Sequence, residues 1–188
     1  MQQIDKELKQ RVLNQSRFRK SISFLRNNQH LGTEAFTPGY QSNCFGTVAF
    51  VLKIEREIES NWRRLNPDGG LRDAMGNYCI LALPSLQRPS YIGELPFSEF
   101  IKDESFCTRV EEYGARDRII TFSYVCNNTE ACGYHLRHAG IYLGEGLFFE
   151  QRNKGEEFGV NSVDLWINSL SKNCVRPINV EYFRLNPR

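Results

Sequence analysis

Several features of other protein classes are missing from this chain of 188 residues. No stretch of about 18 consecutive apolar residues is present, which excludes a membrane-spanning helix. No short apolar segment follows the first residues, so we expect no Sec-type signal peptide. The 24 basic and 22 acidic residues leave a net charge of only +2, without the strongly basic stripe that nucleic-acid binding requires. With 40% hydrophobic residues, the composition predicts a globular domain.

Metal-binding cysteine pairs are also missing. The six cysteines include no Cys-x-x-Cys, and Cys126 and Cys132 do not form a zinc-finger pattern. We therefore expect neither a metal nor a cofactor. Most of the thiols are expected to be reduced and buried. Without a secretory signal, a cytoplasmic location, or export without a Sec signal, is favoured.

The first residues, 2–28, predict one amphipathic helix, on which Phe18, Ile22 and Leu25 follow helical spacing. Because this apolar stripe is modest, we favour a helix docked on the core. A membrane-surface or targeting helix is the alternative. That alternative depends on seven basic residues: Lys6, Lys9, Arg11, Arg17, Arg19, Lys20 and Arg26.

A second helix is predicted from Cys44 to Leu65, ended by the turn at residues 66–70. Residues 66–112 are irregular and broken by prolines, so we expect small helices and loops there. Nothing in the composition marks a domain boundary, and residues 1–188 are expected to form one domain.

After Arg118 the sequence changes to β-branched and aromatic stretches that predict strands. The predicted elements are strands at 118–125, 138–143, 147–151, 158–160 and 175–185, and a helix at 163–170 capped by Ser162. Helices followed by a mostly antiparallel sheet define an α+β fold.

Cys44 is the first candidate for catalysis because it lies where a polar loop opens an apolar helix. The unpaired N–H groups of a helix start stabilise a thiolate and can hold an oxyanion. A small buried residue at a helix start is the alternative interpretation.

His138, at the start of a predicted strand, is the candidate general base for Cys44. His135 is the rival base, but it lies in a loop-like segment. His30 follows the first helix in a polar stretch and is expected to be an exposed residue without a role.

Two motifs resemble those of NlpC-type, papain-like cysteine peptidases. Asn43-Cys-Phe-Gly-Thr-Val48 is similar to their Asp-Cys-Ser-Gly-Leu-Val motif. His138-Ala-Gly-Ile-Tyr-Leu-Gly144 is similar to their His-Val-Gly-Ile-Tyr-Leu-Gly motif. The segment at 115–122 is similar to the Asp-containing strand that precedes the His motif. The resemblance covers roughly residues 36–55 and 113–165.

This resemblance implies an α+β fold with the nucleophile at a helix N-terminus packed on a sheet. It also implies that Cys44 is the nucleophile and His138 the base. The family mostly hydrolyses amide bonds in bacterial cell-wall peptides, so a peptide or peptidoglycan-like substrate is implied. Relatives act as amidases or acyltransferases.

The third catalytic residue is Glu150 or Gln151. The family places a polar residue about twelve positions after the His, which is Glu150 here. In a hairpin with a two-residue turn, Gln151 would share the face of His138. A three-residue loop at 144–146 would put Glu150 there instead. We favour Glu150, because three-residue loops ending in glycine are common. Either residue could instead be an exposed strand end.

The sequence thus predicts a thiol hydrolase that forms an acyl-enzyme on Cys44. Tyr40, four residues upstream, is a candidate oxyanion donor. Residues 66–112 are expected to form a lid or wall over the site. An acyltransferase or deamidase on the same fold is an alternative. So is a non-catalytic binding domain, which Phe45 in place of the family's small Ser favours.

Overall fold

The N-terminal half of the molecule is mainly helical. The computed structural model describes residues 5–37, 40–72, 78–81, 88–111, 115–125, 135–152, 154–171 and 177–187. Its first elements are α1 (Lys6–Gln15), α2 (Arg19–Asn27), α3 (His30–Thr33), β1 (Ala35–Thr37), β2 (Tyr40–Gln41), α4 (Cys44–Leu52) and α5 (Glu55–Leu65). Next along the chain are β3 (Ile80–Leu81), β4 (Tyr91–Ile92) and α6 (Glu94–Lys102).

The C-terminal half forms an antiparallel sheet of six strands. Its elements are β5 (Cys107–Val110), β6 (Arg118–Tyr124), β7 (His135–Gly144), β8 (Leu147–Gln151), β9 (Phe158–Ser162), α7 (Val163–Ser171) and β10 (Asn179–Leu185). The strand order is β5-β10-β6-β7-β8-β9, and every neighbouring pair is antiparallel. Helices followed by an antiparallel sheet confirm the α+β prediction. Part of the predicted last strand, residues 175 and 176, lies outside the described residues.

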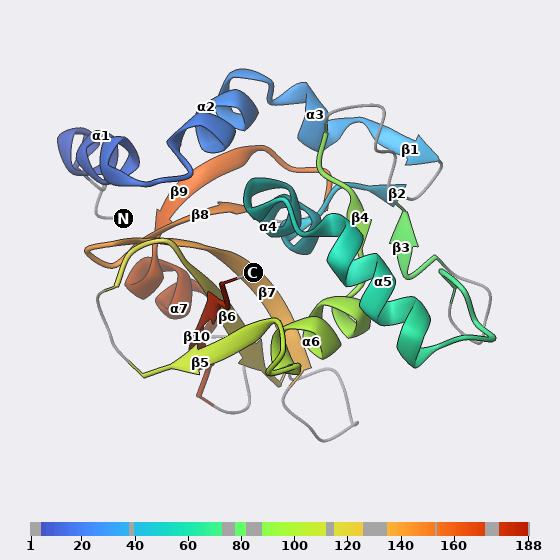
Figure 1. The fold of residues 1–188 in the computed structure, drawn as a ribbon. Helices are drawn as coiled ribbons and strands as arrows, with labels where there is room; N and C mark the ends of the chain where they lie inside the picture. Colours follow the sequence, from blue (N-terminus) through green and yellow to red (C-terminus); the bar gives the residue numbers. More distant parts are fainter. Residues whose placement is uncertain are drawn as a thin grey trace.

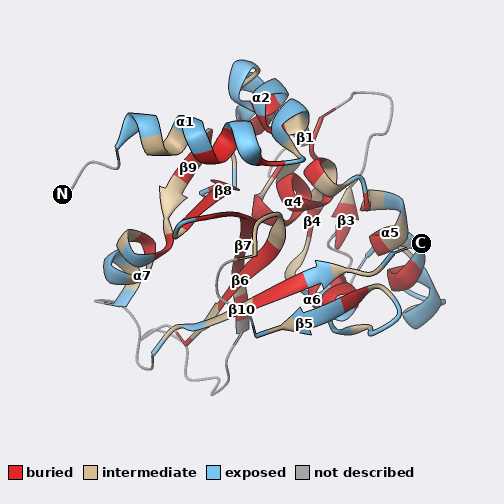
Figure 2. Cartoon of the chain, turned by 60° about the vertical axis from the view of Figure 1, so that its left-hand side comes forward, coloured by how far each residue is buried: buried red, intermediate tan, exposed pale blue. Residues whose placement is uncertain are grey.

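The sheet separates two hydrophobic cores, because successive side chains of a strand point to opposite faces. On β7, Ala139 and Ile141 belong to the larger core, together with the apolar side of α4. Tyr142 belongs to the smaller core, together with Trp166 of α7. Helix α7 therefore lies across the sheet from α4 (Figure 1). The central strands and α4 are almost entirely buried (Figure 2).

The prediction of one continuous helix over residues 2–28 is wrong, because this segment forms two helices, α1 and α2. The chain turns at Ser16, whose hydroxyl donates a hydrogen bond to Asp117, as does the backbone N–H of Arg17. Both helices bury their apolar side chains in the larger core, as expected for docked helices. No helix in the described part of the chain is long and apolar enough to cross a membrane.

The predicted helix at 44–65 is also two helices. Lys53 adopts a left-handed conformation with φ of 58°, which ends α4. After this turn Ile54 and Ile58 both face the larger core, and α5 packs along α6. The break therefore lets two differently directed helices bury apolar side chains in one core.

The described part of the segment 66–112 supports α4 from the side. The Asn43 side chain donates a hydrogen bond to the carbonyl of Ile92 in β4. Phe97 of α6 stacks on Phe45, with ring centroids 5.0 Å apart. Apolar residues of this segment belong to the same core as α4, so the segment contributes to the main core.

Candidate active site

Cys44 is the first residue of α4, and its local surroundings follow from the residue before it. Asn43 is extended and caps the helix, since its side-chain oxygen accepts the N–H of Gly46. The N–H groups of Cys44 and Phe45 have no acceptor within the helix. The partial positive charge of the helix start therefore surrounds the sulfur, as the sequence predicted.

His138 lies between Cys44 and Glu150. Its Nε2 atom forms a short hydrogen bond with the Glu150 carboxylate. The Cys44 side chain lies close enough to the ring for its charge and hydrogen bonding to raise the pKa of His138. With Nε2 engaged, Nδ1 is the nitrogen left to face the sulfur. The three side chains are nearly buried, with exposed fractions of 7% for Cys44, 2% for His138 and 1% for Glu150.

The pKa of His138 is governed by opposing effects. Burial, the largest of them, lowers it. The charges and hydrogen bonds of Cys44 and of Glu150 together outweigh burial and raise the pKa from 6.5 to about 9. The imidazolium form of His138 is therefore favoured at neutral pH.

The register of the β7–β8 hairpin explains why Glu150 reaches His138. The turn has two residues, at 145–146, so the expected three-residue loop is wrong. A bulge at Leu143 shifts the register instead. Position 150 therefore shares the face of His138, and position 151 points to the opposite face.

Gln151 has a different place, in the larger core. It is fully buried, and its side-chain oxygen accepts hydrogen bonds from Ser42 and Thr47. Its side-chain nitrogen donates to the carbonyls of Gly32 and Glu156. Gln151 thus ties α3 and the start of α4 to the sheet. The interpretation of either residue as an exposed strand end is wrong.

Two residues that the sequence analysis missed complete the site. The Trp166 ring stacks on His138 with centroids 4.7 Å apart and an interplanar angle of 19°. The Asn161 side chain donates a hydrogen bond to the second oxygen of Glu150. Asn161 lies on β9, two positions beyond the residue that pairs with Glu150. Continuing the strand alternation through residue 162 would have placed Asn161 on the face of Glu150.

Cys44 and His138 open into a cavity of about 400 Å³ at one end of the sheet. The start of α4 forms one side of this cavity, and α7 forms another. The ends of β6 and β8 and the beginning of β7 complete it. Its lining residues are Asn43, Cys44, Phe45, Tyr124, Arg137, His138, Arg152, Lys154, Trp166, Ser169 and Leu170.

Tyr40 does not occupy the position expected of an oxyanion donor. It is not among the described lining residues. Its hydroxyl accepts the N–H of Tyr78, and its ring packs against Tyr78 and Tyr91. The segment 66–112 is likewise not among the described lining residues, contrary to the expected lid or wall. The described residues of the segment contact the cavity from behind its lining: Tyr91 lies under Lys154, and Glu94 forms an ion pair with Arg137.

The other histidines are not in the described site. His30 is exposed at the start of α3. His135 is the first residue of β7, and its side chain lies outside the described residues. Within the described residues, no cluster of His, Cys, Asp or Glu could hold a metal ion.

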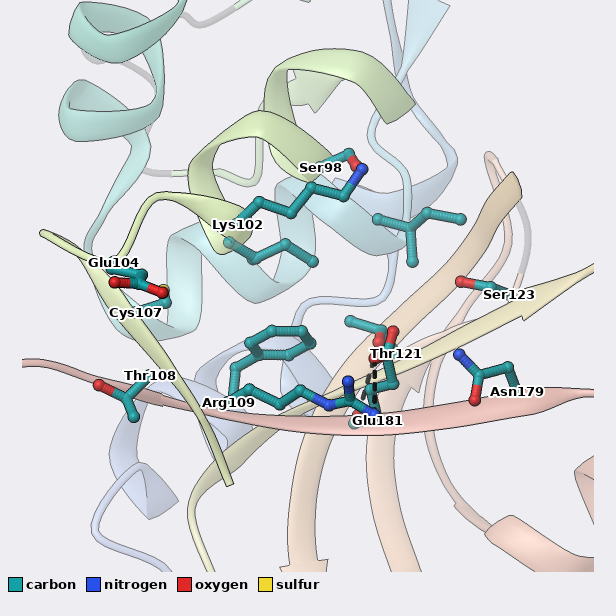
Figure 3. A pocket seen from close by; sticks show the side chains of 13 residues that line it. Ser98, Lys102, Glu104, Cys107, Thr108, Arg109, Thr121, Ser123, Asn179 and Glu181 are labelled. Carbon is teal, nitrogen blue, oxygen red and sulfur yellow. Dashed lines mark hydrogen bonds and ion pairs between the residues drawn. The ribbon is translucent and has the colours of Figure 1, made fainter. Parts of the chain in front are cut away.

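A larger cavity of about 730 Å³ lies between α6 and strands β5, β10 and β6 (Figure 3). It contains Cys107, but burial, and next the charge of Asp103, raises the pKa of this thiol to about 12. Cys107 therefore remains a thiol at neutral pH. Of these two cavities, it is the smaller one that has a histidine, His138, beside its cysteine, Cys44.

We predict that iodoacetamide at neutral pH labels Cys44 at least about tenfold faster than an ordinary protein thiol, because thiolates are the reactive form. Peptide mapping by mass spectrometry after brief labelling measures the rate at each cysteine. Replacing His138 with asparagine should remove the advantage of Cys44. Faster labelling of any other cysteine in the folded protein would contradict the prediction.

Comparisons of the chain with protein-family models, curated proteins and solved structures find no match.

Proposed function

We propose that this protein is a thiol hydrolase that cleaves an amide bond through a Cys44–His138–Glu150 triad and an acyl-enzyme. The observation that carries the proposal is His138 held between a buried carboxylate and a cysteine at a helix start. We further propose that the fold is of the papain-like NlpC type, which has the same order of nucleophile, base and polar third residue along the chain.

In the proposed reaction, the Cys44 thiolate attacks the carbonyl carbon of the substrate amide. The oxyanion that forms accepts a hydrogen bond from the Cys44 backbone N–H. The His138 imidazolium donates its Nδ1 proton to the leaving nitrogen, and the C–N bond breaks to give a thioester and a free amine. His138 then deprotonates a water molecule, which attacks the thioester and releases the acid and the thiol.

Glu150 acts through His138 in this scheme. Its hydrogen bond to Nε2 leaves Nδ1 directed at the sulfur, and its charge stabilises the imidazolium. Asn161 holds the other carboxylate oxygen, which fixes the orientation of the carboxylate. Trp166 covers one face of the imidazole and shields it from water.

Transfer of the acyl group to an amine or alcohol, or deamidation, would use the same first step and differ in the acceptor or the leaving group. A non-catalytic binding domain is less well supported. Phe45, which favoured that alternative, is 6% exposed and stacks on Phe97 in the core. Phe45 therefore packs beneath the cavity and leaves the sulfur accessible from it.

The proposal is tested by incubating the protein with a panel of cell-wall peptides, other peptides and acyl esters. Intact-mass spectrometry should detect an acyl adduct on the protein, and chromatography should detect the released amine or alcohol. Cys44→Ala should show neither, whereas Cys107→Ala should retain both. Turnover by Cys44→Ala would exclude the triad. The absence of any adduct with a protein whose Cys44 is otherwise reactive would favour the binding-domain alternative.

The raised pKa of His138 leads to a specific pH dependence. Because the imidazolium must donate its proton, kcat/KM should hold through neutral pH and fall as pH rises through about 9. With an ordinary histidine pKa the fall would begin near 6.5. Glu150→Gln removes a contribution that raises the pKa, so its decline should begin at lower pH. Measuring kcat/KM of both proteins across this pH range locates each decline, and circular dichroism at each pH confirms that the proteins stay folded. A wild-type decline centred near 6.5 would contradict the assignment.

A further inference from the structure

The charged side chains among the described lining residues of the Cys44 cavity are all basic or histidine. Arg137, Arg152 and Lys154 line it, and no acidic residue is among its described lining residues. The one nearby acid of the triad, Glu150, is buried and bonded to His138 and Asn161. The part of the cavity that substrate can reach is therefore electropositive.

Arg137 is placed in the cavity by the strand geometry. A bulge in β7 opposite Phe122 and Ser123 makes Arg137 the extra residue, so it lines the cavity next to His138. It forms an ion pair with Glu94, whose carboxylate lies 3.8 Å from one guanidinium nitrogen. Its Nε is buried without a hydrogen-bond partner in the described part of the chain. The side chain is 31% exposed, so its terminal nitrogens can donate hydrogen bonds to an oxyanion in the cavity.

The other two cations come from the segment after β8. Within the described residues Arg152 forms no ion pair, and its side chain is exposed at the rim. The Lys154 ammonium lies over the rings of Tyr40 and Tyr91, 5.3 and 5.4 Å from their centroids. Cation–π contacts with the two rings hold this ammonium at the cavity.

The larger cavity provides a contrast within the same molecule. There, two basic residues, Lys102 and Arg109, are matched by two acidic ones, Glu104 and Glu181 (Figure 3). Arg109 and Glu181 form an ion pair of 3.1 Å. Basic side chains without acidic ones among the described lining residues therefore distinguish the cavity with the nucleophile from the larger cavity.

We propose that the substrate carries an oxyanion, a carboxylate or a phosphate, close to the scissile acyl group, and that Arg137, Arg152 and Lys154 recognise it. This inference rests on the proposed function, because it concerns the same cavity. The Arg137 guanidinium, next to His138, binds the oxyanion through its fork of N–H donors. Arg152 and Lys154 neutralise charge at the rim and attract the substrate from solution.

Two alkylating agents that differ in charge test the inference without any substrate. Iodoacetate is anionic and iodoacetamide is neutral, and both alkylate the Cys44 thiolate. The ratio of their rate constants, divided by the same ratio for free cysteine, measures the preference of the cavity for an anion. Arg137→Gln, Arg152→Gln and Lys154→Gln should each lower this ratio by about three- to tenfold at low salt. Arg184→Gln on β10, which lines neither cavity, should leave it unchanged.

The variants are needed because the His138 imidazolium also attracts iodoacetate, and its contribution stays the same in all of them. Raising the salt from about 0.01 M to about 1 M should reduce the preference of the wild-type protein, because screening shortens from about 30 Å to about 3 Å. Protection of Cys44 from iodoacetamide then identifies the anion. N-acetylglutamate against N-acetylglutamine tests a carboxylate, and inorganic phosphate tests a phosphate.

The outcomes separate this inference from the proposed function. Equal ratios in the wild-type protein and the three variants would overturn the anion site and leave the triad standing. A Cys44 that reacts with neither reagent would overturn the proposed function itself. Protection by N-acetylglutamate but not by N-acetylglutamine would support a carboxylate substrate. Protection by phosphate alone would support a phosphate-bearing one.

Discussion

Replacing Glu150 with glutamine is expected to lower kcat by about 10- to 100-fold, which corresponds to about 1.4 to 2.8 kcal/mol in the barrier. The amide fills the same space and can still accept a hydrogen bond from His138, so the protein should fold. It no longer carries the charge that stabilises the imidazolium. Turnover of the best substrate from the panel measures the loss, and Glu150→Ala should lose more.

The neighbouring residue provides the matched control for this experiment. Gln151→Ala removes a side chain that bonds to Ser42, Thr47 and two backbone carbonyls. Leaving these buried groups unpaired should cost about 3 kcal/mol of folding free energy. The folded fraction should retain near-normal kcat, because Gln151 faces away from His138. If Gln151→Ala lowered kcat more than Glu150→Gln did, the assignment of the third residue would be wrong.

Gly46→Ala is expected to be among the most destabilising single substitutions in this chain. An added Cβ would lie 1.6 Å from the carbonyl oxygen of Ser90, where the segment before β4 crosses the first turn of α4. The backbone would have to move, at a cost of about 3 kcal/mol or more. Thermal unfolding should show a melting temperature lower by about 6–12 °C, for a chain of this size.

Gly159→Ala is the matched control, because its nearest neighbour to an added Cβ is 3.9 Å away and its φ is not left-handed. Its melting temperature should change by less than about 2 °C, within the range of surface substitutions. A Gly46→Ala variant as stable as Gly159→Ala would show that the Ser90 segment does not pack against α4 in solution. The contact between Gly46 and Ser90 could then not contribute to holding the helix that begins at Cys44.

The change from helices to strands, and the places of Cys44 at a helix start and His138 on a strand, could be predicted because their signals are local. A capping asparagine before an apolar helix marks the Cys44 helix, and a β-branched and aromatic segment marks the strand of His138. Glu150 was selected partly on the wrong ground, a three-residue loop. The actual cause is a bulge at Leu143, which no residue of the hairpin signals by itself.

What the sequence could not provide depends on distant packing. The turn at Ser16 is held by Asp117, and the helix that follows the break at Lys53 packs along α6, both partners being far away along the chain. Trp166 looked like an ordinary apolar residue of a short helix, and only the sheet topology places its ring on His138. The cavity lining depends on the meeting of three strand ends, which spacing along the chain does not reveal.

The division of the interior into two cores has a consequence for how catalysis responds to damage. Cys44 belongs to the larger core, whereas the rings that surround His138 belong to the smaller one. Loosening either core changes the spacing between sulfur and imidazole, while the other core still maintains most of the folded structure. Turnover would then report on the relative position of the two cores. Under mildly destabilising conditions it should fall before circular dichroism detects unfolding.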